Sequence, residues 1–212
     1  MIIVLVGRTH SNKAWVANAL IKASEGKFEK VTVYTTKPGL DGHTCVSQEQ
    51  YKHYSDRGDI FYSTTDSEHN KFFVLRSELS SGRDLIYCID EPGAVDYMDD
   101  LGVPYCIVFV DSSTDAILSR SSEARDNTRL TKLRLEKTAT RTKQFDKSAE
   151  YTMYVNTSLP NSESGIKQAS SELVALIEEW MNERDEDDFY MTPLLVAYGP
   201  EWSHADDTVF AI

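Results

Sequence analysis

Gly7 and Lys13 are the residues whose types and spacing point most clearly to a chemistry. They bound the sequence GRTHSNK, which follows an apolar run near the start of the chain. The phosphate-binding pattern G-x-x-x-x-G-K-[ST] has its first glycine and its lysine at the same spacing; its lysine reaches the β- and γ-phosphates, and its hydroxyl binds Mg²⁺. The spacing therefore predicts a phosphate site. We expect its residues to be Gly7, Thr9, Ser11, Asn12 and Lys13.

Two positions of this loop depart from the pattern. Asn12 takes the place of the second glycine, and Ala14 takes the place of the metal-binding hydroxyl. Asparagine adopts left-handed backbone conformations more readily than other non-glycine residues, so the loop shape is compatible with Asn12. Ala14 cannot bind a metal ion, and His10 adds bulk where phosphates would approach. The sequence thus favours the loop shape over tight binding of a Mg-nucleotide; the alternative is an ordinary strand-to-helix turn with Lys13 exposed.

The residues on either side of the loop predict the elements that hold it. The run 2–6 is apolar without alternation, which is typical of a central parallel strand buried on both faces. After the loop, apolar residues recur three and four positions apart, as on one face of a helix, at Val16, Ala19 and Ala23. A strand, a turn and a helix in this order direct backbone N–H groups and the positive end of the helix dipole at one point. That point suits an anion.

The rest of the chain alternates between strand and helix patterns. Strands are predicted at 30–36, 60–65, 71–75, 84–90, 105–110 and 150–156 from β-branched, aromatic and apolar runs. Helices are predicted at 48–58, after the capping residue Ser47, at 91–101, from Thr114 onward and at 164–181. Such alternation predicts an α/β fold with a parallel sheet flanked by helices, right-handed crossovers, and ligands at the carboxyl ends of the strands.

Several short sequences, in their order, resemble the guanylate kinase family of nucleoside monophosphate kinases. They are VGRTHSNKA, VYTTKPGLDG, VSQEQYKHYSDRGDIF, YCIDEPGA, RDNT and YTMYVN, and they fall within residues 1–182. The resemblance implies a P-loop fold with a mixed β/α insert that binds the monophosphate and a helical, arginine-rich lid. The implied boundaries are 1–34, 84–119 and 148–183 for the core, 35–83 for the insert, 120–147 for the lid, and 184–212 for a C-terminal extension beyond the family's usual end.

The resemblance also implies roles for the basic residues. Lys13, Arg125 and Arg134 match the family's catalytic cations, and Arg120 matches a further phosphate-binding residue less closely. Phosphoryl transfer depends on positioning and positive charge more than on covalent chemistry. ATP and Mg²⁺ would be the cofactors of an active enzyme, although no residue is assigned to the metal. The alternative is that the arginines between 120 and 134 form a solvated helix face.

The acceptor-site positions depart further from the family's pattern. They are occupied by Thr35, Lys37, Tyr62, Phe73 and Asp90. Lys37 keeps the charge of the family's first phosphate-reading arginine but lacks its planar fork. Tyr62 stands in place of the base-reading glutamate, and Phe73 lies in a segment that has lost the family's hydroxyls. Because an unpaired polar group can reduce selectivity by powers of ten, we expect GMP to be a poor substrate.

These departures leave two functional hypotheses. In the first, the chain is a catalytically impaired, guanylate-kinase-like pseudoenzyme that binds a nucleotide, a phosphate ligand or a protein partner. In the second, it is an active nucleoside monophosphate kinase with altered acceptor specificity, and its metal is held by phosphates, water and Asp90. Damage at both the donor and the acceptor positions favours the first hypothesis.

Composition limits the other function classes. The 212 residues are 41% hydrophobic and 26% charged, as in soluble globular proteins, and the net charge of −12 argues against general nucleic-acid binding. No apolar run approaches the ~20 residues of a membrane span, so no membrane partner is expected. Three cysteines without metal-ligand spacing favour reduced thiols and a cytoplasmic location.

The segment 184–212 is acidic at its start and then rich in aromatic residues. A disordered tail would contain fewer aromatics. We expect this segment to pack back on the domain, or to mediate self-association or the binding of a protein partner. A further hypothesis is that the acidic surface mimics nucleic acid and occupies a basic partner.

Overall fold

The computed structural model describes residues 1–66, 68–89, 95, 97–124, 127–148, 153–156, 175 and 194–195. The larger sheet contains β1 (Ile2–Val6), β2 (Glu29–Lys30), β7 (Leu85–Ile89), β8 (Tyr105–Asp111), β9 (Met153–Asn156) and β10 (Leu194–Leu195). The smaller sheet contains β3 (Tyr34–Thr35), β4 (Thr44–Cys45), β5 (Ile60–Thr65) and β6 (Lys71–Leu75). The helices are α1 (Lys13–Ala23), α2 (Gln48–Asp56), α3 (Arg76–Leu79), α4 (Thr114–Glu123), α5 (Thr128–Ser148) and the 3-10 helix η2 (Asp99–Leu101). Within the described residues, no helix combines the length and the apolar character needed to cross a membrane.

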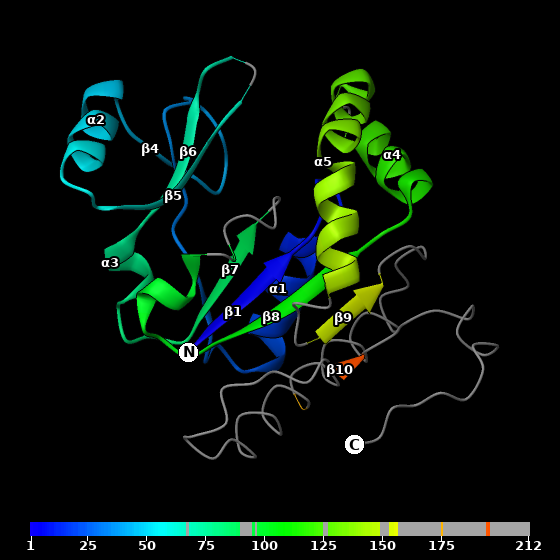
Figure 1. Ribbon diagram of the computed structural model, residues 1–212, viewed down its shortest axis with the longest axis horizontal. Helices are drawn as coiled ribbons and strands as arrows, with labels where there is room; N and C mark the ends of the chain where they lie inside the picture. The colour runs from blue at the N-terminus through cyan, green and yellow to red at the C-terminus, as the bar shows by residue number, and fades with distance from the viewer. Residues whose placement is uncertain are drawn as a thin grey trace.

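The larger sheet is parallel throughout, in the order β10-β9-β8-β1-β7-β2, and it has helices around it, so the predicted α/β fold is confirmed (Figure 1). β1 is central. Its last residue, Val6, pairs with Ile89 of β7 on one side and with Phe109 of β8 on the other. The loop after β1 therefore leaves the middle of the sheet at its carboxyl edge, where parallel α/β sheets bind ligands.

The two faces of the larger sheet bury separate hydrophobic clusters, which explains why β1 lacks alternation. Ile3 and Leu5 pack on the face covered by α1, where they meet Leu20. Val4 points to the other face and packs in the cluster that contains Met98. All these side chains are fully buried, and each such aliphatic residue contributes about 1.5–3 kcal/mol to the free energy of folding.

The smaller sheet belongs to the segment that carries α2, and it has the order β4-β3-β6-β5. The predicted strands at 60–65 and 71–75 are confirmed as an antiparallel pair. The predicted cap at Ser47 is confirmed and forms a capping box: Ser47 Oγ accepts from the Gln50 backbone N–H, and the Gln50 side chain accepts from the Ser47 N–H. Phe73 is the core of this unit, with its ring 5.4 Å from that of Tyr34 and 5.2 Å from that of Tyr51.

The prediction of one continuous strand at 30–36 is wrong, because the segment contributes two short strands to different sheets. Glu29–Lys30 pairs with β7 in the larger sheet, whereas Tyr34–Thr35 pairs with β4 and β6 in the smaller one. Between them, the Val31 N–H donates to the Ile86 carbonyl and its side chain enters the core. The β-branched run 30–36 favours extended backbone everywhere, but it carries no signal for the sheet that each half joins.

Two other predictions are tested only in part. Of the predicted helix at 91–101, the described residues show 3-10 geometry, including Asp99–Leu101, and not an α-helix. Of the predicted helix at 164–181, only residue 175 is described, and it is helical. Within 184–212, Leu194–Leu195 adds a strand beside β9 in the chain's own sheet, so this part of the extension packs on the core.

Two arms rise from the carboxyl edge of the larger sheet (Figure 1). One arm is the smaller sheet with α2, and the other is the pair α4 and α5; β1 ends at the sheet edge between them. The loop after β1 begins at Gly7, whose backbone lies against β8: a Cβ atom there would be 2.2 Å from the Val110 carbonyl oxygen and 2.7 Å from Ser11 Oγ. A side chain at residue 7 would therefore push the loop away from the sheet.

We expect Gly7→Ala to destabilise the protein by about 3 kcal/mol or more, because the added methyl group overlaps backbone that cannot yield. Gly58→Ala is the matched control. Gly58 has φ +72 and open space around the added Cβ, so the same substitution there should cost about 1–2 kcal/mol of conformational strain. Urea denaturation of both variants measures the difference. Equal losses would show that the contact with Val110 is not a rigid constraint.

Candidate functional site

The loop from Gly7 to Lys13 turns sharply between β1 and α1. His10 and Asn12 have φ values of 57° and 68°, and the Ser11 N–H donates to the Arg8 carbonyl at 3.1 Å. Asparagine tolerates this left-handed region better than most residues, so Asn12 can adopt the backbone conformation that the pattern assigns to a glycine. Ser11 is fully buried beneath the loop.

Lys13 lies inside the loop and is not exposed to solvent. Its side chain is 7% exposed, and its Nζ donates at 2.8 Å to the carbonyl oxygens of both Gly7 and Arg8. These carbonyl oxygens replace water as the hydrogen-bond partners of the buried Nζ. The prediction of an exposed Lys13, which belonged to the alternative of an ordinary turn, is therefore wrong.

The N-terminus of α1 opens onto the same loop. Its N-cap residue, Asn12, makes no side-chain hydrogen bond to the first turn, which contains no acidic residue. The Asn12 Nδ2 atom is buried and has no hydrogen-bond partner within the described part of the chain. Ala14, next along the helix after Lys13, is exposed. The positive end of the α1 dipole therefore lies next to the loop. The first turn of the helix carries the methyl group of Ala14 where the pattern has a metal-binding hydroxyl.

Two arginines tie the loop to the end of β8. Arg8 donates to Asp111 Oδ1 at 3.3 Å and to the Ser112 carbonyl. Arg120, from α4, donates to Ser112 Oγ at 2.8 Å and to the His10 carbonyl at 3.1 Å. Burial lowers the pKa of Arg120, but an arginine stays charged in any protein environment at neutral pH. Three positive charges, those of Lys13, Arg8 and Arg120, therefore surround one backbone loop.

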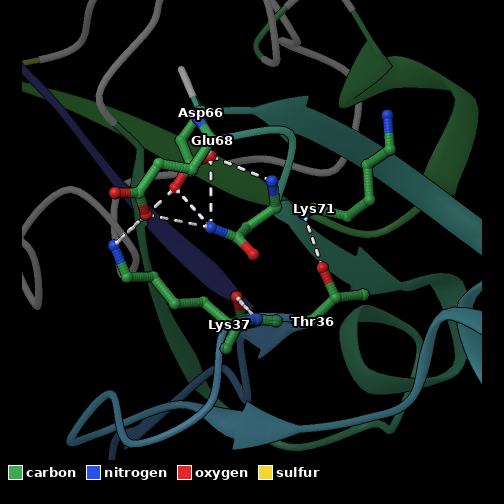
Figure 2. A network of polar contacts seen from close by, with 7 residues as sticks. Thr36, Lys37, Asp66, Glu68 and Lys71 are labelled. Carbon is green, nitrogen blue, oxygen red and sulfur yellow. Dashed lines mark hydrogen bonds and ion pairs between the residues drawn. The ribbon is translucent and has the colours of Figure 1, made fainter.

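Lys37, on the insert, is bound by two carboxylates. Its Nζ donates to Glu68 Oε2 at 2.9 Å and lies 4.0 Å from Asp66 Oδ2 (Figure 2). The hydrogen bond and the charge of Glu68 raise the pKa of Lys37, and the positive charge of Arg134 opposes that rise. Lys37 is therefore bound within the insert itself, by Glu68 and Asp66.

Asp66 organises the turn that carries Glu68. Its carboxylate accepts from the backbone N–H groups of Glu68 and Asn70 at 2.8 and 2.9 Å, and from Asn70 Nδ2. Burial opposes ionisation of Asp66, but the hydrogen bonds from Asn70 and Glu68 outweigh it and hold the pKa of Asp66 below its usual range. The turn is therefore fixed by its own hydrogen bonds.

The other predicted acceptor-site residues lie inside the insert or at its base. Thr35 is fully buried, and its Oγ1 accepts from the Lys37 backbone N–H at 3.0 Å. Phe73 is 2% exposed within the aromatic cluster of this arm. The ring of Tyr62 packs against that of Tyr97, with 6.2 Å between their centroids.

The structure thus brings together one group of predicted site residues. Gly7, Ser11, Asn12, Lys13 and Arg120 meet at the loop, where Thr9 is half-buried. Lys37 lies on the insert, paired with Glu68, and Arg134 lies on α5 in the other arm. Arg125 and Asp90 lie outside the described residues. Among the residues described, no group of three or more His, Cys, Asp or Glu side chains could hold a metal ion.

The sequence did not single out Arg8, Ser112 or Glu68. No local pattern marks Arg8, because its partners Asp111 and Ser112 are about 100 residues away in the chain. Glu68 had a weak signal, since the polar run from Asp66 to Asn70 has the composition of a tight turn. Its pairing with Lys37 depends on the pairing of β3 with β6 and could not be read from the turn alone.

Comparisons with known proteins bear on the fold. No protein-family model and no curated protein matches the sequence. The guanylate kinase from Anaplasma phagocytophilum superposes with a TM-score of 0.58 at 17% identity, over 85% of this chain and 85% of that one. Shikimate kinases from Bacteroides thetaiotaomicron and Aquifex aeolicus give TM-scores of 0.48 and 0.46 at 16% and 15% identity, over 84% and 87% of this chain and 98% and 100% of theirs. At these identities, the likeness to the guanylate kinase shows a P-loop kinase-like fold and nothing more specific.

Replacing Asn12 by glycine should stabilise the protein by about 1 kcal/mol. Glycine removes both the left-handed strain of residue 12 and a buried amide group without a partner, which outweighs the greater freedom of glycine in the unfolded chain. Asn12→Ala is the control, because it removes the amide but keeps the strain. Thermal and urea unfolding should rank Asn12→Gly above Asn12→Ala; the reverse order would contradict this account of the loop.

The contribution of Asp66 should depend on pH. Because its folded pKa is depressed, its stabilisation is complete above the unfolded value of about 4 and is lost as pH falls through the folded pKa. Asp66→Asn keeps the shape but removes the charge, so wild type should exceed it in unfolding free energy at neutral pH. The difference should shrink below about pH 4.

Asp41→Asn is the control, at an exposed position of the same arm, and it should change the unfolding free energy less at neutral pH. A loss of stability in Asp66→Asn that does not vary with pH would contradict the charge-based explanation.

Proposed function

We propose that this chain binds the phosphate groups of a nucleotide in the Gly7–Lys13 loop, and that it is a guanylate-kinase-like pseudoenzyme with impaired phosphoryl transfer. The observation that carries the proposal is the position of Lys13. A buried ammonium held by the Gly7 and Arg8 carbonyls lies directly under a loop that receives the N-terminus of α1. A fixed cation, backbone N–H groups and a helix dipole directed at one place form an anion site.

The surroundings of the loop add to this positive field. Arg120 contacts the loop at the His10 carbonyl, and Arg8 pairs with Asp111 beside it. The chain as a whole carries −12, so three basic side chains at one loop contrast with the charge of the whole sequence. Such a site suits a compact anion with several charged oxygens better than an extended polyanion.

Two features support impaired transfer. Ala14 offers no oxygen to Mg²⁺ at the place where the loop pattern has a hydroxyl, so the metal would depend on phosphate oxygens and water. On the acceptor side, Phe73 is buried in the core of the insert and Lys37 is already paired with Glu68. Phosphoryl transfer requires both substrates to be positioned, and the acceptor side offers few polar groups for that purpose.

One observation favours the alternative, an active nucleoside monophosphate kinase with altered acceptor specificity. The chain keeps a cation at Lys37 on the insert and another at Arg134 on α5 of the other arm, and transfer between bound phosphates would require positive charge on both sides. This alternative predicts turnover with some acceptor and a dependence of that turnover on Lys13.

We expect wild type to bind ATP by isothermal titration calorimetry at low salt, and Lys13→Met to bind it at least about tenfold more weakly, because one fixed charge and its hydrogen bonds are lost. Lys22→Met, on the exposed end of the same helix, is the matched control and should bind as wild type does. Arg120→Ala provides a second test if Lys13→Met unfolds. Equal binding by wild type, Lys13→Met and Arg120→Ala would contradict the proposed site.

The impairment is tested with Ala14→Ser, which places a hydroxyl where the loop pattern binds Mg²⁺. This variant should gain affinity for ATP only when Mg²⁺ is present, while wild type should respond little to the metal. A coupled assay of ADP release across the nucleoside monophosphates completes the test. Turnover by wild type that disappears in Lys13→Met would overturn the pseudoenzyme proposal in favour of the active kinase.

A further inference from the structure

The cation of the insert, Lys37, is bound by a carboxylate of the chain itself, that of Glu68. Lys37 is the position that the family resemblance assigns to an acceptor phosphate, and its Nζ lies 2.9 Å from Glu68 Oε2. In Figure 2 the lysine side chain extends across to the turn between β5 and β6, where Glu68 and Asp66 face it. Two carboxylates at one ammonium leave a net negative charge at this point.

Both partners of this ion pair are held at their backbones. On one side, Asp66 fixes the turn by accepting from the N–H groups of Glu68 and Asn70. On the other side, the Lys37 N–H donates to Thr35 Oγ1, and Thr36 exchanges backbone and side-chain hydrogen bonds with Lys71 (Figure 2). The backbones that carry Lys37 and Glu68 are therefore fixed relative to each other, so the two side chains start from positions that bring their charged ends together.

The Glu68 side chain is nevertheless accessible, with 67% of it exposed, and that of Lys37 is 39% exposed. A ligand can therefore reach the pair from solvent without unfolding the insert. An anion that displaced the Glu68 carboxylate would meet the Lys37 ammonium with Asp66 as the one remaining carboxylate, whereas an anion that approached with Glu68 in place would meet both carboxylates.

We propose that Glu68 is a specificity-determining residue that occupies the place of an acceptor phosphate at Lys37 and excludes phosphate monoesters from the insert. The proposal rests on the proposed function in one respect, because it takes the insert to be the acceptor side of a phosphate-transfer fold. It concerns a different part of the molecule from the Gly7–Lys13 loop. It can therefore be measured without ATP.

The test compares Glu68→Gln with wild type by calorimetric titration of AMP, GMP, CMP and UMP, each beside its own nucleoside, at low salt and without ATP. Loss of the carboxylate should strengthen the binding of every monophosphate by about tenfold and leave the nucleosides unchanged, because the barrier is charge repulsion. The gain should fall as salt is added. Glu49→Gln removes the same charge from the exposed first turn of α2 and should give no gain.

A double variant shows whether the gain comes from the cation that Glu68 releases. In Lys37→Ala/Glu68→Gln, the increase in monophosphate affinity should disappear, and thermal unfolding checks that both variants remain folded. Three results would each overturn the proposal: no gain in folded Glu68→Gln, an equal gain for nucleosides, or a gain that survives the loss of Lys37.

The same samples titrated with ATP separate this proposal from the previous one. Binding of ATP that depends on Lys13, together with no gain in Glu68→Gln, removes only the assignment of Glu68. A monophosphate gain that depends on Lys37, in a chain that does not bind ATP, removes only the donor-site proposal.

Discussion

The contact between Gly7 and β8 is the constraint on which the functional end of the molecule depends. β1 is buried on both faces between β7 and β8, so its end cannot shift sideways, and the Val110 carbonyl leaves no room for a side chain at residue 7. The chain must therefore turn at once into the loop, which closes over the Lys13 ammonium. Arg8 and Arg120 then attach the loop to the end of the same strand, β8. Packing in the sheet thus determines where the loop runs and where the Lys13 ammonium lies.

The Gly7–Lys13 loop and the insert bind their lysines with different groups. At the loop, the Lys13 Nζ donates to the carbonyl oxygens of Gly7 and Arg8, which are neutral. At the insert, the Lys37 Nζ donates to the Glu68 carboxylate, which also carries the opposite charge. The hydrogen bonds are of similar length in the two places, 2.8 and 2.9 Å, but a carboxylate competes with an incoming anion for the cation more strongly than a carbonyl oxygen does. This difference is the physical basis for proposing ligand binding at the loop and exclusion at the insert.

The sequence was sufficient to predict most strands, but it did not predict which strands pair or which distant side chains contact each other. The runs 2–6, 60–65 and 71–75 predicted strands correctly because their apolar, β-branched and aromatic residues favour extended and partly or fully buried backbone. The run 30–36 failed because its two halves have the same propensity but join different sheets. At the site, spacing alone identified Gly7 and Lys13. The pairings of Arg8 with Asp111 and of Lys37 with Glu68 arise from the sheet order and the pairing of β3 with β6, to which no local pattern responds.

Residues 7, 13 and 14 of the loop differ in whether the fold itself requires them. Gly7 and Lys13 have structural duties that hold without any ligand: one permits the approach to β8, and the other binds the carbonyl oxygens of a strained turn. A chain that had lost all catalysis would still require both. Ala14 has no such duty, because it is exposed at the start of α1 and a hydroxyl there would disturb no packing. A substitution at residue 14 therefore tests metal binding without changing the packing, whereas a substitution at Gly7 or Lys13 also changes contacts of the fold. The same reasoning applies to Glu68, whose exposed carboxylate is not needed for the hydrogen bonds by which Asp66 fixes the turn.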